Sequence, residues 1–362
     1  MHTQSNFRLL VVRLGAMGDI LHALPAVTAL RQAHPGWTID WVVEPRWRAL
    51  LAAEDSAGQA ISLRPIPPNP AQPVVDGLHF AATKEWRKAP LSRKTLHEIK
   101  VMRNALKAGD YDVALDLQGA IRSAMVARLS GSRRRIGEAM PRERLASWLF
   151  TERVCTLGAH VIEQDLELAA AVAGDDLSPV PPWIPVDSAA ESWAETILPA
   201  SARLPAVLVN PGAGWGAKRW PVARYAAVAQ ALAHRGLRVL VNAGPGEEPL
   251  AEAIHHATDV ATPLLCSLPQ LIALTRRVSL VIAGDTGPLH LACALGRPVV
   301  GIYGPTDPSR NGPFGTRCKV LRSPLSRRDH TRRAVPEAGL LTIQPEDVLR
   351  AVEELLQPEN AA

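Results

Sequence analysis

The chain has 362 residues, too many for one ordinary hydrophobic core, and this length indicates two α/β domains. Apolar residues make up 47% of the chain and charged residues 21%, as in a soluble globular protein. The 40 Lys and Arg against 35 Asp and Glu give a net charge of +5, which is compatible with an anionic partner but does not identify one. The few Phe and Tyr and the scattered Trp offer no stacking platform for single-stranded nucleic acid, and no apolar stretch approaches the roughly 20 residues of a membrane-spanning helix.

The cysteines and the start of the chain indicate a reducing compartment. No CxxC motif and no Cys/His ligand spacing occurs, which argues against a zinc site and against a disulfide framework. The apolar run near the start, flanked by Arg8 and Arg13, is too short for a signal peptide. We therefore expect a cytoplasmic protein, at most peripheral to a membrane. The four cysteines are Cys155, Cys266, Cys293 and Cys318.

The stretch Arg8–Pro25, RLLVVRLGAMGDILHALP, joins a strand, a glycine turn and the start of a helix. The continuous apolar run Leu9–Val12 predicts a parallel strand that is buried on both faces. From Ile20 onward, apolar residues recur at helical spacing. Asp19 therefore lies at the carboxyl end of the first strand, where open α/β sheets place their ligands. Asp is also a preferred helix N-cap residue, and position alone favours that structural role.

A second predicted strand, Trp37–Glu44, leaves another class of protein open. Glu44 closes this strand roughly where a dinucleotide-binding fold would place the acid that binds the ribose. The glycines before Asp19 do not spell the complete dinucleotide fingerprint. A nicotinamide oxidoreductase of Rossmann type, or a nucleotide-binding module without chemistry, therefore stays an alternative.

The segment between Lys84 and Lys107 is strongly basic, with eight Lys or Arg against two Glu. Most of these side chains are typical of a solvated helix face. The bunching of Lys84, Arg87 and Lys88 around Trp86 suits a mobile loop that could close on an anionic substrate.

A further strand is predicted over Tyr111–Leu117, YDVALDL. It is followed by Arg122, which puts that side chain on the same rim as Asp19 if the sheet is parallel. This rim would then carry both an acid and a cation.

A Pro-rich stretch, Leu177–Val186, predicts a domain boundary. Beyond it the strand-turn-helix pattern begins again, and each strand runs into a polar or glycine-rich turn. A helix follows the turn at 285–287 and ends at Gly296. Its start, with a Thr and a free glycine backbone, is a ready anion site. The predicted strands are Ala206–Val209, Arg238–Val241, Leu280–Ala283 and Val299–Tyr303.

Three motifs and the overall length resemble those of a known family. The motifs are RLGAMGDILHALPAVTALR at 13–31, KRWP at 218–221 and DTGPLHLACALGRPVVGIYGPTDP at 285–308. In them the chain resembles the lipopolysaccharide heptosyltransferases of glycosyltransferase family 9. The MGDILH form of the first motif, together with WRK at 86–88, is most similar to the heptosyltransferase I branch. The resemblance covers nearly the whole chain.

This resemblance implies a GT-B fold, in which two Rossmann-like parallel-sheet domains face each other across a cleft. The acceptor would lie on the first domain and the nucleotide-sugar donor on the second. The family members are inverting and independent of a catalytic metal, so no cofactor is expected. The donor in this branch is ADP-L-glycero-β-D-manno-heptose, and the acceptor is a Kdo sugar of Kdo2-lipid A. Such an anionic acceptor would explain the basic first domain and would allow peripheral contact with the inner membrane surface.

The resemblance also implies roles for residues of the first domain. Asp19 matches the general base of the family, which takes a proton from the acceptor hydroxyl. The basic side chains on the first domain would bind the anionic acceptor. These acceptor-binding candidates are Lys84, Arg87, Lys88 and Arg122.

The second domain would hold the donor. Lys218 matches the phosphate-binding lysine of the family, although a lysine there could also coat the surface. Glu247 matches the acid that contacts the donor's ribose. Thr286 and Gly287 would offer backbone N–H groups to the diphosphate, while Asp285 either orients the sugar or holds its turn. The donor-binding candidates are Lys218, Glu247, Asp285, Thr286, Gly287 and His290, the last of which could equally be a core histidine.

The expected domain limits follow from these assignments. They are 1–176 for the acceptor-binding domain, 177–204 for the Pro-rich linker region, 205–341 for the donor-binding domain, and 342–362 for a C-terminal helix crossing back to the first domain. At Ala213 and Gly214 the chain lacks the hydroxyl residues that the best-known branch members place near the phosphates. A family member with another nucleotide sugar or acceptor is therefore an alternative. The Arg-rich segment 323–340 has no functional account from the sequence.

Overall fold

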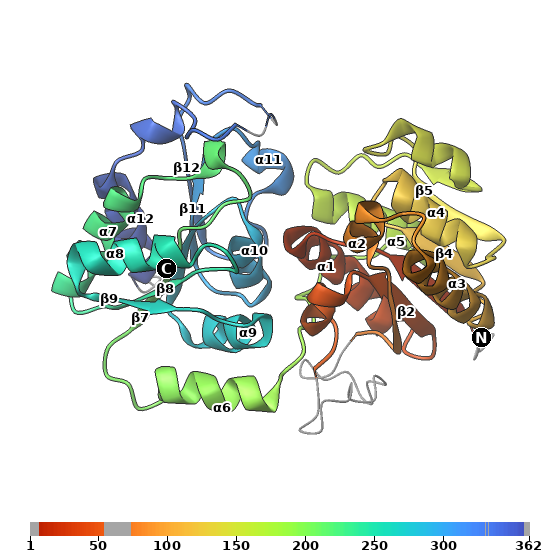
Figure 1. Ribbon diagram of the computed structural model, residues 1–362, viewed down its shortest axis with the longest axis horizontal. Coiled ribbons are helices and arrows are strands. Elements are labelled where there is room, and N and C mark those ends of the chain that lie inside the picture. The colour runs from red at the N-terminus through yellow and green to blue at the C-terminus, as the bar shows by residue number, and fades with distance from the viewer. Residues whose placement is uncertain (1–6, 54–73, 330, 332, 358–362) are drawn as a thin grey trace. The chain divides into compact units, whose positions relative to one another are not determined.

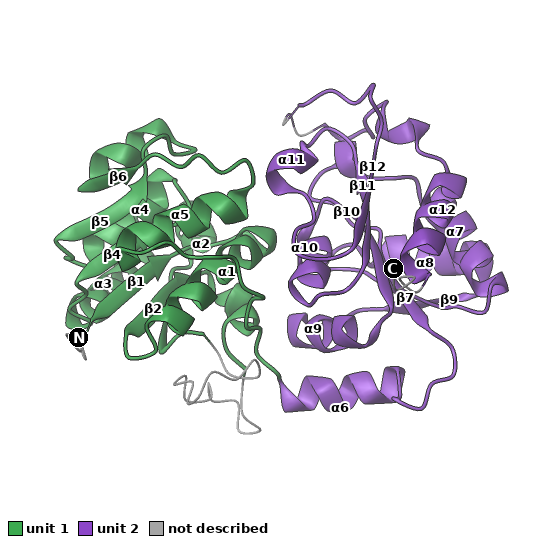
Figure 2. Ribbon diagram, turned by 180° about the vertical axis from the view of Figure 1, so that it is seen from behind, with its two compact units in different colours: residues 1–186 green, residues 187–362 purple. Residues whose placement is uncertain are grey.

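The structure is a computed structural model of the chain, and it describes residues 7–53, 74–329, 331 and 333–357. The chain divides into two compact units, residues 1–186 and 187–362 (Figure 2). Each unit is built on a parallel sheet covered by helices on both faces (Figure 1). The predicted GT-B class with two Rossmann-like units is confirmed at this level. The limit between the units falls inside the predicted linker region 177–204.

The first unit contains a parallel sheet with the strand order β3-β2-β1-β4-β5-β6. Its strands are β1 (Arg8–Val12), β2 (Thr38–Val43), β3 (Gly77–Phe80), β4 (Val113–Asp116), β5 (Arg134–Glu138) and β6 (Glu152–Val154). Its helices are α1 (Met17–Ala33), η1 (Pro45–Leu50), α2 (Thr83–Lys88), α3 (Arg93–Ala108), α4 (Ile121–Leu129), η2 (Arg144–Leu149) and α5 (Val161–Ala173). The order reverses between β1 and β4, which is the switch point where such sheets bind ligands.

Strand β1 and helix α1 form the centre of this unit. Leu9–Val12 are fully buried, which confirms the prediction of a strand covered on both faces. Helix α1 is buried along most of its length and packs against α5. The turn between β1 and α1, which leads to Asp19, is therefore held by a buried strand before it and a buried helix after it.

The second unit repeats the plan, with the strand order β12-β11-β10-β7-β8-β9. Its strands are β7 (Ala206–Asn210), β8 (Arg238–Asn242), β9 (Ala261–Leu264), β10 (Leu280–Gly284), β11 (Val299–Tyr303) and β12 (Cys318–Arg322). Its helices are α6 (Ser188–Ile197), η3 (Gly216–Lys218), α7 (Val222–His234), α8 (Glu248–Thr258), α9 (Leu268–Arg277), α10 (Gly287–Ala294), α11 (Pro308–Asn311), η4 (Leu340–Thr342) and α12 (Pro345–Leu356). Here the switch point lies between β7 and β10.

The C-terminal helix α12 packs within the second unit. Val348, Val352 and Leu355 are buried in the core cluster that also contains β7, β8 and α7 residues. This apolar face explains why α12 lies on the second sheet (Figure 1). The family's helix that braces the first domain stays a prediction for this chain.

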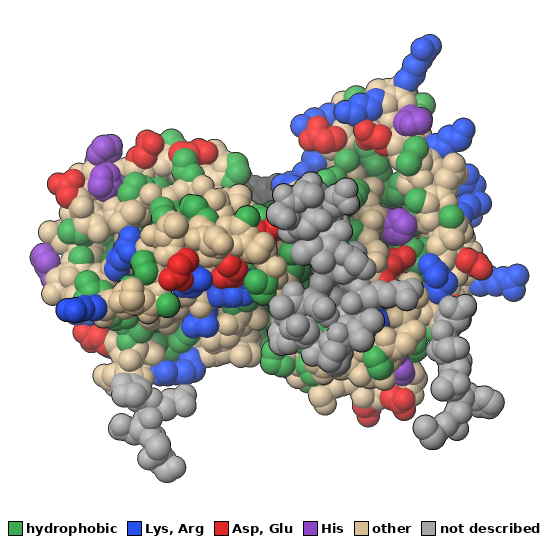
Figure 3. Space-filling view, turned by 90° about the horizontal axis from the view of Figure 1, so that it is seen from below, with side chains coloured by type: hydrophobic (Ala, Val, Ile, Leu, Met, Phe, Trp, Pro, Cys, Tyr) green, Lys and Arg blue, Asp and Glu red, His purple; other side chains and the backbone are tan. Residues whose placement is uncertain are grey.

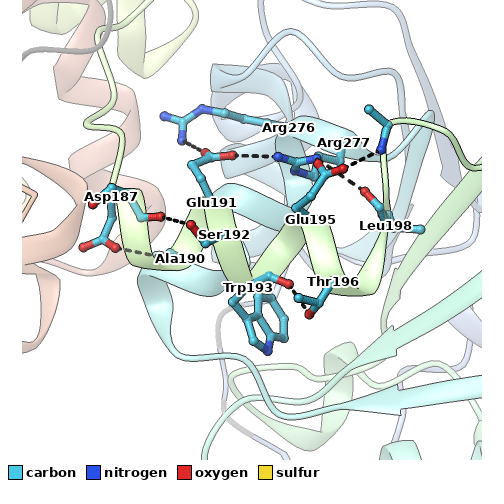
Figure 4. Close-up of polar contacts among 12 residues, drawn as sticks. Asp187, Ala190, Glu191, Ser192, Trp193, Glu195, Thr196, Leu198, Arg276 and Arg277 are labelled. Atoms are coloured by element: carbon cyan, nitrogen blue, oxygen red, sulfur yellow. Dashed lines mark hydrogen bonds and ion pairs between the residues drawn. The ribbon is translucent and has the colours of Figure 1, made fainter.

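Helix α6 occupies part of the stretch that was predicted as a linker, and it docks on α9 of the second unit (Figure 4). Asp187 caps its first turn by accepting the N–H of Ala190. Glu191 pairs with Arg276 at 2.8 Å, and Glu195 pairs with Arg277. The stretch after the prolines is thus ordered helix.

Two further expectations concern the whole chain. The four cysteines are free thiols, in keeping with the absence of a disulfide pattern in the sequence. Among the described residues, none of the helices combines the length and the apolar character that a bilayer-spanning segment needs.

Candidate active site

The first turn of α1 carries Asp19, the candidate base. Asp19 is not the N-cap residue, which is Ala16, but its Oδ2 accepts the N–H of Ala16 at 2.8 Å. Its Oδ1 lies 3.4 Å from Nη2 of the buried Arg13. The Asp19 side chain is 42% exposed. The carboxylate therefore supports the helix start and is also open to a substrate.

The turn before Asp19 depends on Gly15. Its φ of +148° is one that residues with a side chain rarely adopt, and a Cβ there would lie 2.7 Å from Nε1 of Trp47. Trp47 lies in η1, where the guanidinium of Arg46 stands 4.4 Å from its ring centroid. The β1–α1 turn is thus packed directly against η1, so a side chain at Gly15 has no room.

A buried carboxylate, Asp116, ends the neighbouring strand β4. Its Oδ1 accepts the N–H groups of Gln118 and Gly119, both at 2.8 Å. Burial raises the pKa of Asp116 to about 6, against smaller lowering effects from these hydrogen bonds, from the Ser123 side chain and from the charge of Arg13. Among the described residues, no group hydrogen-bonds its buried Oδ2. A strongly perturbed acid at a switch point is typical of a functional site.

Electrostatic interactions connect three of the four predicted acceptor-binding residues, Lys84, Arg87 and Arg122. The pKa of Lys84 is lowered by partial burial and then by the positive charges of Arg46, Arg122 and Arg87, while Glu44 acts in the opposite direction. The positive charges of three guanidinium groups thus act on the exposed ammonium of Lys84. Such a cluster favours an anionic ligand.

The basic segment around Trp86 is a helix, α2, and not the loop that its composition suggested. Trp86 is partly buried against the core of the first unit and donates its Nε1–H to Glu98 at 2.8 Å. Lys88 pairs with Glu85 at 2.8 Å on the exposed side. Six residues are too few for helical periodicity to show in the sequence. Lys88 thus differs from Lys84 in already having an acidic partner.

In the second unit, Lys218 and Asp285 form a buried ion pair at the switch point. Each side chain is only 10% exposed, and Nζ of Lys218 also donates to the backbone oxygen of Asp285 at 3.3 Å. His290 Nε2 lies 3.4 Å from Asp285 Oδ1. Burial would raise the pKa of Asp285, but the hydrogen bond from His290 and the charge of Lys218 hold it well below its usual range. His290 is therefore a partner of the site as well as a buried residue.

The start of helix α10 lies next to this pair. Thr286 is the N-cap residue, and its hydroxyl donates to the backbone oxygen of Gly284 at 3.2 Å. The first N–H groups of a helix, from Gly287 onward, have no partner within the helix. This helix start favours an anion at the rim, and the charge of the neighbouring Lys218 is balanced here by Asp285.

Glu247 links two loops of the same rim. It precedes α8, and its Oε1 accepts the N–H of Ala213 at 3.1 Å. Gly212 lies directly beside this carboxylate, since a Cβ there would come 2.0 Å from Oε2 of Glu247 and would displace the side chain. In this arrangement the backbone at Ala213 is held by Glu247, at the place where the chain lacks hydroxyl side chains.

Glu44, the candidate ribose-binding acid of an oxidoreductase, is buried and engaged with its own unit. Its carboxylate accepts the hydroxyl of Thr83 at 2.8 Å and pairs with Arg46 at 3.1 Å. These contacts link the end of β2 to α2 and to the cationic cluster.

Sequence reasoning missed Arg13, Arg46 and Asp116 as parts of the candidate site. Arg13 directly follows the buried strand β1, and Asp116 is the last residue of the buried strand β4. Each is thus a polar residue at the strand end where α/β sheets bind their ligands. That signal was present in LLVVR and in VALD. Arg46 follows β2 inside a short 3₁₀ helix, and nothing in its local pattern separates it from a surface arginine.

Comparisons with known proteins agree with this geometry. A family model described as "Glycosyltransferase family 9 (heptosyltransferase)" matches residues 99–339. The chain is 33% identical over 329 residues to Lipopolysaccharide heptosyltransferase 1 of Escherichia coli (strain K12), which covers 88% of this chain and 94% of the relative. It is 29% identical over 319 residues to the protein of the same name from Pseudomonas aeruginosa (strain PAO1), covering 85% and 81%.

Two solved structures are similar over nearly the whole chain. "E. coli heptosyltransferase WaaC with ADP" has a TM-score of 0.77 and 28% identity, and the match covers 96% of this chain and 100% of that one. "E. coli heptosyltransferase WaaC with ADP-2-deoxy-2-fluoro heptose" has a TM-score of 0.74 at the same identity, covering 96% and 99%.

Proposed function

The chain belongs to glycosyltransferase family 9, and we propose that this glycosyltransferase moves L-glycero-D-manno-heptose from ADP-heptose to a Kdo sugar of the lipopolysaccharide inner core, Kdo2-lipid A. The reaction is inverting and needs no metal ion. The observation that carries the proposal is that each unit has charged groups at the switch point of its own sheet. One unit has an exposed carboxylate at its switch point, and the other has a lysine and a helix start.

The base of the proposed reaction is Asp19. Its carboxylate takes the proton of the acceptor hydroxyl while the hydroxyl oxygen attacks the anomeric carbon and the bond to ADP breaks on the opposite face. The contacts with Ala16 and Arg13 fix the carboxylate, and its exposure leaves it open to the acceptor. The configuration at the anomeric carbon is therefore inverted.

The donor diphosphate gains negative charge as the sugar leaves. Lys218 and the N–H groups at the start of α10 stabilise that charge by a field that is already in place. Asp285 and His290 hold the ammonium of Lys218 at the rim. Glu247 binds the ribose hydroxyls of ADP.

The acceptor is anionic, and the cationic cluster of the first unit binds it. Lys84, Arg87 and Arg122 attract the Kdo carboxylate. Lys88 binds the acceptor on the outer side of α2 after it exchanges its ion pair with Glu85 for one with the acceptor. Because this acceptor is anchored in a lipid, the enzyme works at the inner membrane surface.

The test compares ADP release from ADP-heptose, with and without Kdo2-lipid A, for the wild type and Asp19→Asn. The amide keeps an oxygen that can accept the Ala16 N–H, so the turn stays while the base is lost. We expect turnover to fall about 100-fold to 10,000-fold, which is roughly 3 to 5 kcal/mol of barrier.

The exposed Asp176→Asn is the matched control and should keep wild-type turnover. The anomeric configuration of the product, read by NMR, tests inversion, and added EDTA tests metal independence. A folded Asp19→Asn enzyme with near wild-type turnover would show that Asp19 only supports its helix.

A second candidate is a family member that uses another nucleotide sugar or another acceptor. It is favoured by the turn at Ala213 and Gly214, which offers backbone and no hydroxyl side chain beside Glu247. Faster ADP or UDP release from a different nucleotide sugar, in a panel assayed with the same acceptor, would support it. Binding of NAD(H) without any response to ADP would instead support the oxidoreductase alternative.

A further inference from the structure

The Arg-rich segment 323–340 is joined to the turn that carries Lys218. The N–H of Ala217 donates to the backbone oxygen of Arg333 at 3.0 Å, and the N–H of Glu337 donates to the backbone oxygen of Ala217 at 3.1 Å. Both backbone groups of Ala217 are thus satisfied by this segment. Ala217 directly precedes Lys218, so the segment holds the backbone from which the lysine side chain starts.

The approach between the two segments is as close as backbone allows. A Cβ at Gly216 would lie 1.7 Å from the backbone oxygen of Ala334. Gly216 and Ala217 are both buried under this contact. Any side chain at Gly216 would force the segment and the Lys218 turn apart.

The carboxylate of Glu337 closes the segment on itself. Its Oε2 accepts the hydroxyl of Ser326 at 2.9 Å and the N–H of Leu340 at 2.8 Å. Partial burial would raise the pKa of Glu337, but hydrogen bonds from the backbone of Gly339 and Leu340 and from Ser326 lower it below its usual value. The group is therefore ionised at neutral pH, and its hydrogen bonds are charge-assisted.

Of the described residues of the segment, few besides Leu340 at its end belong to the hydrophobic core. Leu325 is 74% exposed and Val335 is 67% exposed. Arg328 and Arg333 are exposed as well, although each has an acidic partner. What defines the segment is the set of polar contacts to Glu337 and to Ala217.

We propose that Glu337 is a positioning residue of the donor site, which ties the stretch 333–340 to Ser326 and thereby holds the Gly216–Lys218 turn so that Lys218 points at the donor diphosphate. The proposal rests on the function proposed above, in which Lys218 binds the diphosphate of ADP-heptose. It gives the Arg-rich segment a role in donor binding through its backbone.

The test measures ADP binding by calorimetry for the wild type, Glu337→Ala and Glu337→Gln. We expect the Kd for ADP to rise about ten-fold in Glu337→Ala, which corresponds to the loss of roughly one hydrogen bond to a charged group. Glu337→Gln keeps an oxygen acceptor, so its Kd for ADP should lie between those of the wild type and Glu337→Ala. The control is Glu346→Ala, an exposed carboxylate of α12, which should bind ADP as the wild type does.

Steady-state kinetics separate positioning from a general loss of structure. Glu337→Ala should raise KM for ADP-heptose and leave KM for the acceptor unchanged. Gly216→Ala approaches the same contact from the other side and should give the same donor-specific change. If Glu337→Ala does not fold, the KM values of Glu337→Gln and Gly216→Ala test the inference instead. A higher KM for ADP-heptose with an unchanged KM for the acceptor in both variants would support it, and wild-type KM values in both would overturn it.

The outcomes distinguish this inference from the proposed function. A folded Glu337→Ala protein with wild-type Kd for ADP and wild-type donor KM would overturn the inference alone. A rise in both KM values together with lower thermal stability would also overturn it, in favour of a structural role. A wild-type protein that does not bind ADP would overturn the proposed function and the inference with it.

Discussion

Asp116 is the residue in which burial and charge conflict most clearly. Its pKa is raised to about 6 by burial, above the usual value of 3.8. Because the folded state holds this proton more tightly than the unfolded state does, the stability that the proton contributes is fully present below about pH 4. It is lost as the pH rises through 6. This rise in the pKa of Asp116 corresponds to about 3 kcal/mol.

Replacing Asp116 by Asn should therefore change the pH dependence of stability. The amide oxygen can still accept the N–H groups of Gln118 and Gly119, and the side chain no longer ionises. Relative to the wild type, the free energy of unfolding of Asp116→Asn should increase by about 2 to 3 kcal/mol between pH 4 and pH 8. Urea unfolding at both pH values measures this difference, with the exposed Asp176→Asn as a control. An equal difference at both pH values would mean that Asp116 stays charged or stays protonated throughout.

At the scale of elements, the β1–α1 turn shows how a local backbone requirement sets the direction of a functional group. Gly15 combines a positive φ with direct contact to Trp47, and Asp19 follows four residues later. We expect Gly15→Ala to destabilise the protein by about 1 to 3 kcal/mol because of backbone strain and the clash with the indole.

The same substitution should lower turnover more than it lowers ADP affinity, since Asp19 and the donor rim belong to different units. Gly36→Ala is the matched control, because a Cβ at Gly36 meets nothing within 4 Å. Thermal unfolding and the ADP-release assay measure the two effects. Equal stability of the two alanine variants would contradict the role assigned to Trp47.

The elements that the sequence predicted are those with long apolar patterns. The strands Leu9–Val12 and Val299–Tyr303 were visible because burial on both faces demands continuous apolar residues. Helix α2 was missed because it has only six residues, and α6 was missed because it follows a run of prolines. For α6, the N-cap Asp187 was a usable signal.

The candidate site was predictable where a strand end and a family motif coincide, as at Asp19, Lys218 and Asp285. It was not predictable where the relevant property arises only from packing. The perturbed pKa of Asp116 depends on its burial, and the contact of Glu337 with Ser326 depends on how an irregular segment folds back. Neither property has a periodic signature in the sequence.

At the scale of the whole molecule, the two units share one strand order, and each places its charged groups at the switch point of its own sheet. The surface itself is not uniformly basic, since Lys and Arg side chains are interspersed with Asp and Glu on the face seen in Figure 3. On this face the positive charges are therefore local groups among acidic side chains, and in the first unit the charges that act on Lys84 are such a group.

Because each unit has its own sheet and core, a substitution in one unit should leave the stability of the other unchanged. Lys218→Met leaves the buried carboxylate of Asp285 without its ammonium partner, which we expect to cost about 3 to 5 kcal/mol in the second unit. Calorimetry of Lys218→Met should show a lower transition temperature for the second unit and an unchanged one for the first unit. Gly15→Ala should lower the transition temperature of the first unit and leave that of the second unchanged. Adding Asp285→Asn to Lys218→Met removes the unpaired charge and should restore part of the stability without restoring ADP affinity. One cooperative transition that moves in all three variants would show instead that the two units unfold together.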